Sequence, residues 1–169
     1  MKAVTMNIFF LSLDPREAAR MHCDKHVVKM IIESAQMLYC AHWALKSPLP
    51  SNAYKQSHTN HPSCIWVRES LDNYLWLCEL AKELCNEYRF RYGEAKIHKT
   101  EAHIDWLIAN HPVGILNDGF TAPAQAMPDE YKDEDVIVAY RRFYIESKVK
   151  IRNIVTYKVR SVPDFLISI

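Results

Sequence analysis

Glycine is scarce in this sequence, and its scarcity excludes two common nucleotide-binding motifs. The 169 residues contain only Gly93, Gly114 and Gly119. The dinucleotide-binding fingerprint of a Rossmann fold and the phosphate-binding P-loop both require glycines at fixed, short spacings. The three glycines match neither spacing. The sequence therefore excludes both of these nucleotide-binding folds.

The sequence also lacks a charge bias, a paired-cysteine motif and a secretion or membrane segment. Its formal net charge is +1, so the whole chain is not a polycation that coats nucleic acid. The five cysteines, at positions 23, 40, 64, 78 and 85, form no CxxC pair, which indicates reduced thiols that mostly fill the core. The N-terminal run MKAVTMNIFFLSL is too short to span a membrane and lacks the pattern of a secretion signal. We therefore expect a cytoplasmic protein with no membrane partner.

The residues that are present predict a mainly α protein with a single domain spanning 1–169. Hydrophobic residues make up 49% of the chain and charged residues 24%, as in ordinary globular domains of this size. Asp14, Pro15 and Glu17 are typical of a capped helix start, and Gly93 is typical of a helix end. The expected elements are an extended segment or short strand at 7–14, helices at about 15–45, 62–92, 100–110 and 134–152, a long functional loop at about 112–132, and a tail at 162–169 that packs back through Phe165 and Leu166.

The first predicted helix carries its polar residues on one side. At about 100° per residue, they fall within an arc of about 100°, and most of the remaining circumference is apolar. The six residues are His22, Lys25, His26, Lys29, Glu33 and Gln36. Histidine exchanges protons near neutral pH, which favours a stripe that lines a catalytic or binding groove. The alternative is a stripe that simply faces solvent. In either case Glu33 can pair with Lys29 or His26 along the helix. Asp24 falls on the core side, where a buried carboxylate needs partners, so we expect it to cap a loop or orient a histidine.

A second polar cluster, SHTNHP, precedes the next predicted helix. His58, Asn60 and His61 lie where the free backbone N–H groups of a helix start favour an anion such as phosphate. On the helix itself, Arg68 could clamp a phosphate and Trp66 could stack on a base. The alternatives are that Asn60 and His61 only cap the helix and that Trp66 is a core residue.

The four-residue spacing of His22 and His26 is that of half a zinc site on a helix. A third ligand would come from His58, His61 or Asp24. However, the residue after His22 is Cys23, not the glutamate that acts as general base in an HExxH motif. We therefore expect no cofactor, and a divalent metal at His22 and His26 is the alternative.

Several blocks of the sequence together resemble a family of small helical proteins encoded in bacteriophage genomes. The blocks are HCDKHVVKMIIESAQML, SHTNHPSCIWVRES, YRFRYGEAKIHKT, APAQAMPDEYK and AYRRFYIESK. The resemblance spans nearly the whole chain. It implies a phage origin, one compact domain and a location in the cytoplasm of the infected host cell. It implies no particular activity, so no catalytic residue is carried over from it.

The leading hypothesis is a phage-encoded hydrolase of the phosphodiesterase type that acts on a nucleotide. The expected substrate is a cyclic dinucleotide or a related host immune signal, so that cleavage would counter host defence. His22 and His26, or His58 and His61, would form the acid–base pair. The other expected site residues are Glu33 to orient a histidine; Lys25, Lys29 and Arg68 to stabilise phosphate charge; Gln125 and Tyr131 to close over the base; and Asn60, Trp66 and Arg141 as further ligand contacts.

Two other classes of function fit the same residues. The groove could sequester a nucleotide without cleaving it, as a homo-oligomer with sites at the subunit contacts. A base-modifying or glycosylase-like enzyme would instead place residues 141–160 on a DNA or RNA backbone. That segment holds seven basic residues against Glu146 alone, whereas residues 129–135 hold five acids and one base. The basic stretch could also be a solvated helix face, and the aromatic residues could serve a protein interface.

Overall fold

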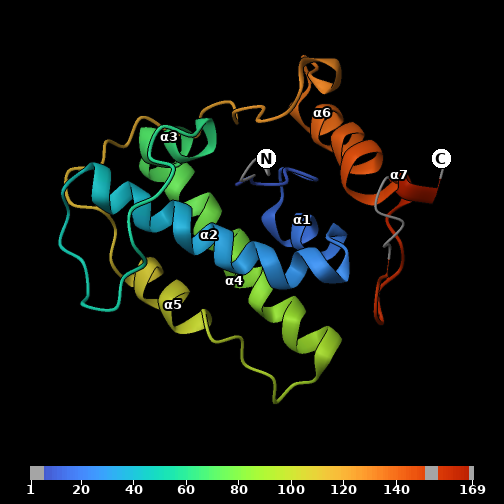
Figure 1. The fold of residues 1–169 in the computed structure, drawn as a ribbon, viewed down its shortest axis with the longest axis horizontal. Coiled ribbons are helices and arrows are strands. Elements are labelled where there is room, and N and C mark those ends of the chain that lie inside the picture. Colours follow the sequence, from blue (N-terminus) through green and yellow to red (C-terminus); the bar gives the residue numbers. More distant parts are fainter. Residues whose placement is uncertain (1–5, 151–155, 168–169) are drawn as a thin grey trace.

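Every regular element in the described part of the chain is helical, in agreement with the predicted fold class. The computed structural model describes residues 6–150 and 156–167, which form one compact domain (Figure 1). The elements are α1 (Pro15–Met21), α2 (Asp24–Ala44), α3 (Pro62–Glu69), α4 (Leu71–Tyr92), α5 (Glu101–Ala109), the 3-10 helix η1 (Asp129–Tyr131), α6 (Val136–Phe143), the π-helix η2 (Tyr144–Lys150) and α7 (Asp164–Ile167). Within these ranges residues 7–14 form the extended lead-in, not the short strand. No helix of the described ranges is long and apolar enough to cross a membrane.

The first predicted helix is in fact two helices, because the chain turns at His22 and Cys23. Both residues have extended backbone dihedrals, so the single helix predicted for 15–45 is wrong at this junction. Hydrogen bonds from distant segments satisfy the backbone there. The Cys23 N–H donates to the Tyr144 hydroxyl at 2.9 Å, and the Arg91 guanidinium donates to the His22 carbonyl at 2.7 Å. A helical period cannot reveal partners so far away in the sequence.

The predicted helix boundaries are confirmed where local capping sets them. Asp14 accepts hydrogen bonds from two N–H groups of the first turn of α1, and Gly93 ends α4 with a φ of 125°. The single run predicted for 62–92 is wrong at Ser70, which has a φ of −152° and separates α3 from α4. The Ser70 hydroxyl caps α4 by accepting from the Asp72 N–H. Serine is a strong N-cap residue and is also tolerated inside helices, so Ser70 alone does not predict that one helix ends and another begins there.

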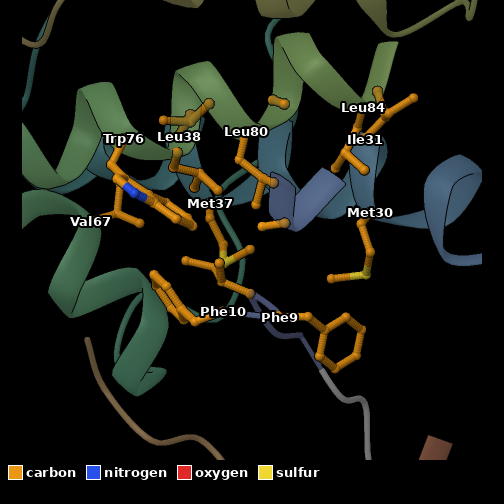
Figure 2. Close-up of a cluster of buried hydrophobic side chains, with 14 of the residues drawn as sticks. Phe9, Phe10, Met30, Ile31, Met37, Leu38, Val67, Trp76, Leu80 and Leu84 are labelled. Carbon is orange, nitrogen blue, oxygen red and sulfur yellow. The ribbon is translucent and has the colours of Figure 1, made fainter. Parts of the chain in front are cut away.

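The core is built around the pair of helices α2 and α4, with α1, α3 and α5 packed against them. The N-terminal segment, residues 6–13, crosses this pair and buries four consecutive apolar side chains. These are Ile8, Phe9, Phe10 and Leu11. Phe10 stacks on Trp76 of α4 with ring centroids 4.7 Å apart, inside the cluster of side chains from α2 and α4 (Figure 2). An apolar lead-in thus serves as a central part of the core.

Helix α6 lies on the other side of the N-terminal segment from α2 (Figure 1). The Arg141 Nε donates to the Leu11 carbonyl at 2.9 Å, which fixes α6 against this segment. The helix predicted for 134–152 changes to a π-helix at Tyr144, and its residues 151–152 lie outside the described residues. In the tail, Leu166 is buried and Phe165 packs against the core, as predicted.

The loop predicted for about 112–132 is confirmed up to residue 128, and the 3-10 helix η1 lies in its last part. Residues 110–128 contain no helix, and side chains of the preceding helices hold them in place. The Trp66 indole N–H donates to the Thr121 carbonyl at 3.1 Å, and the Thr121 N–H donates to Asn73 Oδ1 at 2.9 Å. The end of this loop reaches the N-terminal segment, where the Asn7 amide donates to the Ala126 carbonyl at 2.9 Å.

Candidate ligand-binding site

The polar stripe of α2 faces the N-terminal segment and η2 at some positions and solvent at others. His26 and Glu33 are buried, whereas Lys25 and Lys29 are exposed. His22 is the C-cap of α1, so it is not on the same helix as the rest of the stripe. The stripe therefore divides into buried groups that contact other elements and lysines that reach the surface.

His22 is sealed inside the protein. Its Nδ1 donates to the Ala18 carbonyl at 2.6 Å, and its Nε2 has no hydrogen-bond partner among the described residues. Burial lowers the pKa of His22 to about 4. The ring is therefore neutral near pH 7, and its side chain has no exposed surface through which it could reach a ligand.

His26 contacts the same aromatic neighbours as His22. Its Nδ1 lies 2.7 Å from the Tyr144 hydroxyl, and its ring lies 5.1 Å from that of Phe9. Because the Tyr144 hydroxyl already accepts from the Cys23 N–H, its own proton is available to His26 Nδ1. The His22–His26–Tyr144 cluster thus joins the α1–α2 junction to η2. Sequence reasoning missed Tyr144, although the block AYRRFYIESK places two tyrosines four apart.

Asp24 caps a loop, which confirms one of the two roles predicted for it. Its carboxylate accepts from the Lys158 N–H at 2.9 Å and pairs with Arg91 at 3.1 Å. Arg91 in turn pairs with Glu87 at 2.9 Å, and Glu87 pairs with Arg160 at 2.7 Å. This buried network holds the C-terminal segment against the α1–α2 junction.

Glu33 connects the stripe to the N-terminal segment. Its Oε1 accepts from the Asn7 N–H at 3.1 Å, and its Oε2 lies 3.6 Å from the Lys29 ammonium, which is one of the predicted pairings. The Asn7 side chain binds in three directions. Its Oδ1 accepts from the Ile8 N–H and from the Tyr140 hydroxyl, and its Nδ2 donates to the Ala126 carbonyl. Asn7 was missed because an asparagine in an apolar lead-in carries no motif.

A pocket of about 270 Å³ opens beside Asn7. The N-terminal segment, the start of α3, the end of the long loop and α6 all contribute to its wall. Its lining residues are Met6, Asn7, His61, Pro62, Ala126, Met127, Pro128 and Phe143. We call this the Asn7–His61 pocket. Of the predicted site residues, His61 alone is in its lining; the quoted block APAQAMPDEYK supplies three more positions.

His61 presents one ring nitrogen to the helix and leaves the other available. Its Nδ1 accepts from the Ser63 N–H at 3.1 Å, which caps α3. A nitrogen that accepts carries no proton, so the proton of the neutral ring is on Nε2. Burial, with a smaller contribution from His58, lowers the pKa of His61 and favours this neutral form. No hydrogen-bond partner of Nε2 is found in the part of the chain that the structure describes, so this N–H is free to bind a ligand.

The other residues of the second cluster do not join His61 in the pocket. His58 is exposed with a φ of 53°, and Asn60 is exposed beside it. The Arg68 guanidinium donates to the Thr59 carbonyl and so holds this loop. Trp66 is 2% exposed, and its indole contacts Phe10. The cluster thus contributes His61 to the pocket, while on the following helix Arg68 anchors the loop and Trp66 is a core residue.

The predicted residues of the C-terminal half are mostly bound to the backbone. Gln125 exchanges two hydrogen bonds with the backbone of Asp133, at 2.6 and 3.0 Å, and so closes the loop between them. Tyr131 packs 5.5 Å from the ring of Phe143, next to the pocket. Arg141 lies over the ring of Phe165 at 5.0 Å. The side chains at 148–150 and all of residue 152, which belong to the basic segment, lie outside the described residues.

A larger pocket of about 400 Å³ lies between α1 and α4 and is mainly charged. Its lining residues are Arg16, Arg20, Glu83, Asn86, Glu87, Arg89, Phe90, Glu94 and Arg160. Arg160 pairs with Glu87, and Arg89 pairs with Glu101. The Arg160 guanidinium lies 4.0 Å above one face of the Phe90 ring, and Phe90 is 45% exposed. Phe90 is the one apolar side chain of this lining, so the pocket offers a planar ligand less apolar wall than the Asn7–His61 pocket does.

No group of three or more His, Cys, Asp and Glu side chains in the described residues is arranged to hold a metal ion. No protein-family model matches this chain, and no curated protein or solved structure shows significant similarity to it.

Proposed function

We propose that this protein binds a nucleotide and receives its base in the Asn7–His61 pocket. The observation that carries the proposal is a small pocket of about 270 Å³ that combines apolar walls with a free N–H of His61. Ligand sites for planar organic groups usually have this composition, in which a few polar groups fix the orientation on an apolar wall.

The walls suit an aromatic ring. Met6 and Met127 provide polarisable thioethers, and Phe143 provides an aromatic side chain. Sulfur–aromatic and ring–ring contacts each stabilise a bound ring beyond simple burial. The two prolines of the lining, Pro62 and Pro128, add rigid apolar surface without a competing N–H group.

A positive charge lies close to this pocket. The Lys29 ammonium is 3.6 Å from Glu33, and Glu33 accepts from the N–H of the pocket residue Asn7. Because Lys29 is exposed and its carboxylate partner, Glu33, lies 3.6 Å away, its ammonium could turn to a phosphate at the mouth of the pocket. Lys25, one turn earlier on α2, would add to the same potential.

Hydrolysis of a cyclic dinucleotide is the second candidate, and the observation that favours it is the buried Glu33 carboxylate behind Asn7. Acid–base catalysis needs both a proton donor and a proton acceptor at the ligand. While its Nδ1 caps α3, the neutral His61 ring can donate a hydrogen bond to the phosphate but cannot transfer its Nε2 proton, so Glu33 would have to act as the base and water would have to protonate the leaving group. Binding needs neither role, which makes it the simpler proposal.

The test is a calorimetric titration with the four ribonucleoside 5′-monophosphates, cyclic di-GMP and cyclic di-AMP. His61→Asn removes the Nε2–H, because the shorter asparagine side chain has no atom at the position of Nε2, and it keeps a good helix cap. The matched control is His58→Asn, since His58 has a positive φ that asparagine tolerates. We expect wild type and His58→Asn to bind at least one of these ligands equally, and His61→Asn to bind it about ten-fold more weakly, as for one lost hydrogen bond.

Absence of binding to every ligand in this set would contradict the proposal, and so would an equal loss in the two variants. Recovery of the ligand from denatured protein separates the two candidates. Intact ligand after long incubation supports binding, whereas cleaved cyclic dinucleotide that disappears in Glu33→Gln supports hydrolysis.

A further inference from the structure

The side chains of the Asn7–His61 pocket offer hydrogen-bond donors and lack a strong acceptor. His61 contributes its Nε2–H, because Nδ1 is occupied by the Ser63 N–H. Asn7 Nδ2 carries two hydrogens and uses one of them for the Ala126 carbonyl. Its Oδ1 already accepts from the Ile8 N–H at 2.8 Å. The Tyr140 hydroxyl, 3.2 Å from Oδ1, shares its one hydrogen between this oxygen and the Ala124 carbonyl at 2.7 Å. The other lining side chains are hydrocarbon or thioether.

Such a pair of donors selects among the nucleobases. Guanine carries two neighbouring acceptors, N7 and O6, on one edge. Adenine places an N6 amino group beside N7, so a donor would face a donor, and thymine presents a single acceptor, O4, beside a methyl group. A buried donor without an acceptor is costly, which makes a mismatch more selective than a merely weaker contact.

We infer that the base bound in this pocket is a 6-oxopurine, guanine or hypoxanthine, held through its N7 and O6 atoms by Asn7 and His61. The inference rests on the proposed function and names the ligand class for the same site. Cytosine also has two adjacent acceptors, but its amino group shares their edge and would face the same donors. In guanine the amino group and N1–H belong to another edge, which can point to the open side of the pocket.

The walls agree with a bicyclic base. Phe143 and the thioethers of Met6 and Met127 line the pocket on separate elements, α6, the N-terminal segment and the long loop. A purine presents more ring surface to such walls than a pyrimidine, and buried apolar area increases affinity.

The experiment compares GMP, IMP, 7-deaza-GMP, AMP and CMP in calorimetric titrations of wild type, His61→Asn and His58→Asn. IMP keeps N7 and O6 and should bind like GMP. Each of the others loses or displaces an acceptor, and should bind about ten-fold more weakly or worse. His61→Asn should reduce the difference between GMP and AMP, while His58→Asn should preserve it.

The possible failures are distinguishable. If none of the five nucleotides binds, the proposed function and this inference both fail. If AMP or CMP binds as well as GMP, or if 7-deaza-GMP equals GMP, the base is not held through N7 and O6. The inference is then overturned while nucleotide binding stands.

Discussion

The two histidine pairs of this protein have similar spacing and opposite environments. His22 and His26 lie within a closed aromatic cluster where Phe9 and Tyr144 contact both rings. In the second pair, His58 is exposed and His61 is at the edge of a pocket. The difference lies in the environment of Nε2, the ring nitrogen that the local backbone does not bind. In His22 it is buried inside the protein, whereas in His61 it is free to bind a ligand. We therefore expect the first pair to govern stability and the second to govern binding.

The largest effect on stability should come from the ion network that supports the closed cluster. Arg91 pairs with Asp24 and Glu87 and is itself buried. Replacing Arg91 by leucine would leave two buried carboxylates without this partner, at a cost of about 3–5 kcal/mol. Urea unfolding measures the change. Arg142→Leu, which breaks the exposed pair with Asp133, should cost less than about 1 kcal/mol; an equal cost for both variants would contradict the assignment.

The closed cluster should also make stability depend on pH. Burial lowers the pKa of His22 from 6.5 to about 4, so the unfolded chain binds a proton more readily than the folded one. The contribution is therefore fully present above pH 6.5 and is lost as pH falls from 6.5 toward 4, by about 3 kcal/mol at most. His42 has a similar shift, so the measurement is the difference between wild type and His22→Gln. Identical pH profiles for the two proteins would show that His22 titrates normally.

Tyr144→Phe removes one hydroxyl from the cluster and tests its hydrogen bonds. The Cys23 N–H and His26 Nδ1 would both lose this partner in a buried place, with an expected loss of about 2 kcal/mol. The free energy of unfolding is measured by heat or urea for this variant and for a control, Tyr88→Phe. The Tyr88 hydroxyl makes no hydrogen bond to the described residues, so the difference between the two variants isolates the buried hydrogen bonds. Nucleotide affinity should stay as in wild type, and a ten-fold loss there would mean that the two regions are coupled.

The smallest effect on stability is expected at His61. His61→Ala removes the cap of α3 and should cost about 1 kcal/mol, whereas His61→Asn keeps a cap and should cost less than about 0.5 kcal/mol. The two variants should nevertheless lose ligand affinity to the same extent. If His61→Ala instead loses affinity while His61→Asn keeps it, in parallel with their stabilities, His61 acts only as a cap.

Local sequence signals predicted the elements but not the long-range contacts. Asp14 and Gly93 act through neighbouring backbone groups, so their roles were visible in the sequence. The break at His22 and Cys23 depends on Arg91 and Tyr144, which are far away in the chain. Periodicity predicts which side of a helix is polar, and it carries no information about which distant residue will face it.

The same limit applies to the candidate site. His61 was predicted from its place before a helix, and Glu33 from the polar stripe. The lining residues Met6, Met127 and Phe143 look like ordinary core residues in the sequence, and they became wall residues only when three separate elements met. His22 was predicted to be catalytic because histidines on a polar stripe are candidates for proton transfer, yet its complete burial gives it a structural environment.

The most direct test of this account is nuclear magnetic resonance of the histidine ring nitrogens during titration with GMP. We predict a saturable shift of the His61 Nε2 resonance, with Nδ1 of His61 and both nitrogens of His22 and His26 unchanged. A titration in which GMP shifts the His22 or His26 resonances, or leaves His61 Nε2 where it was, would contradict the division between a closed cluster and an open pocket.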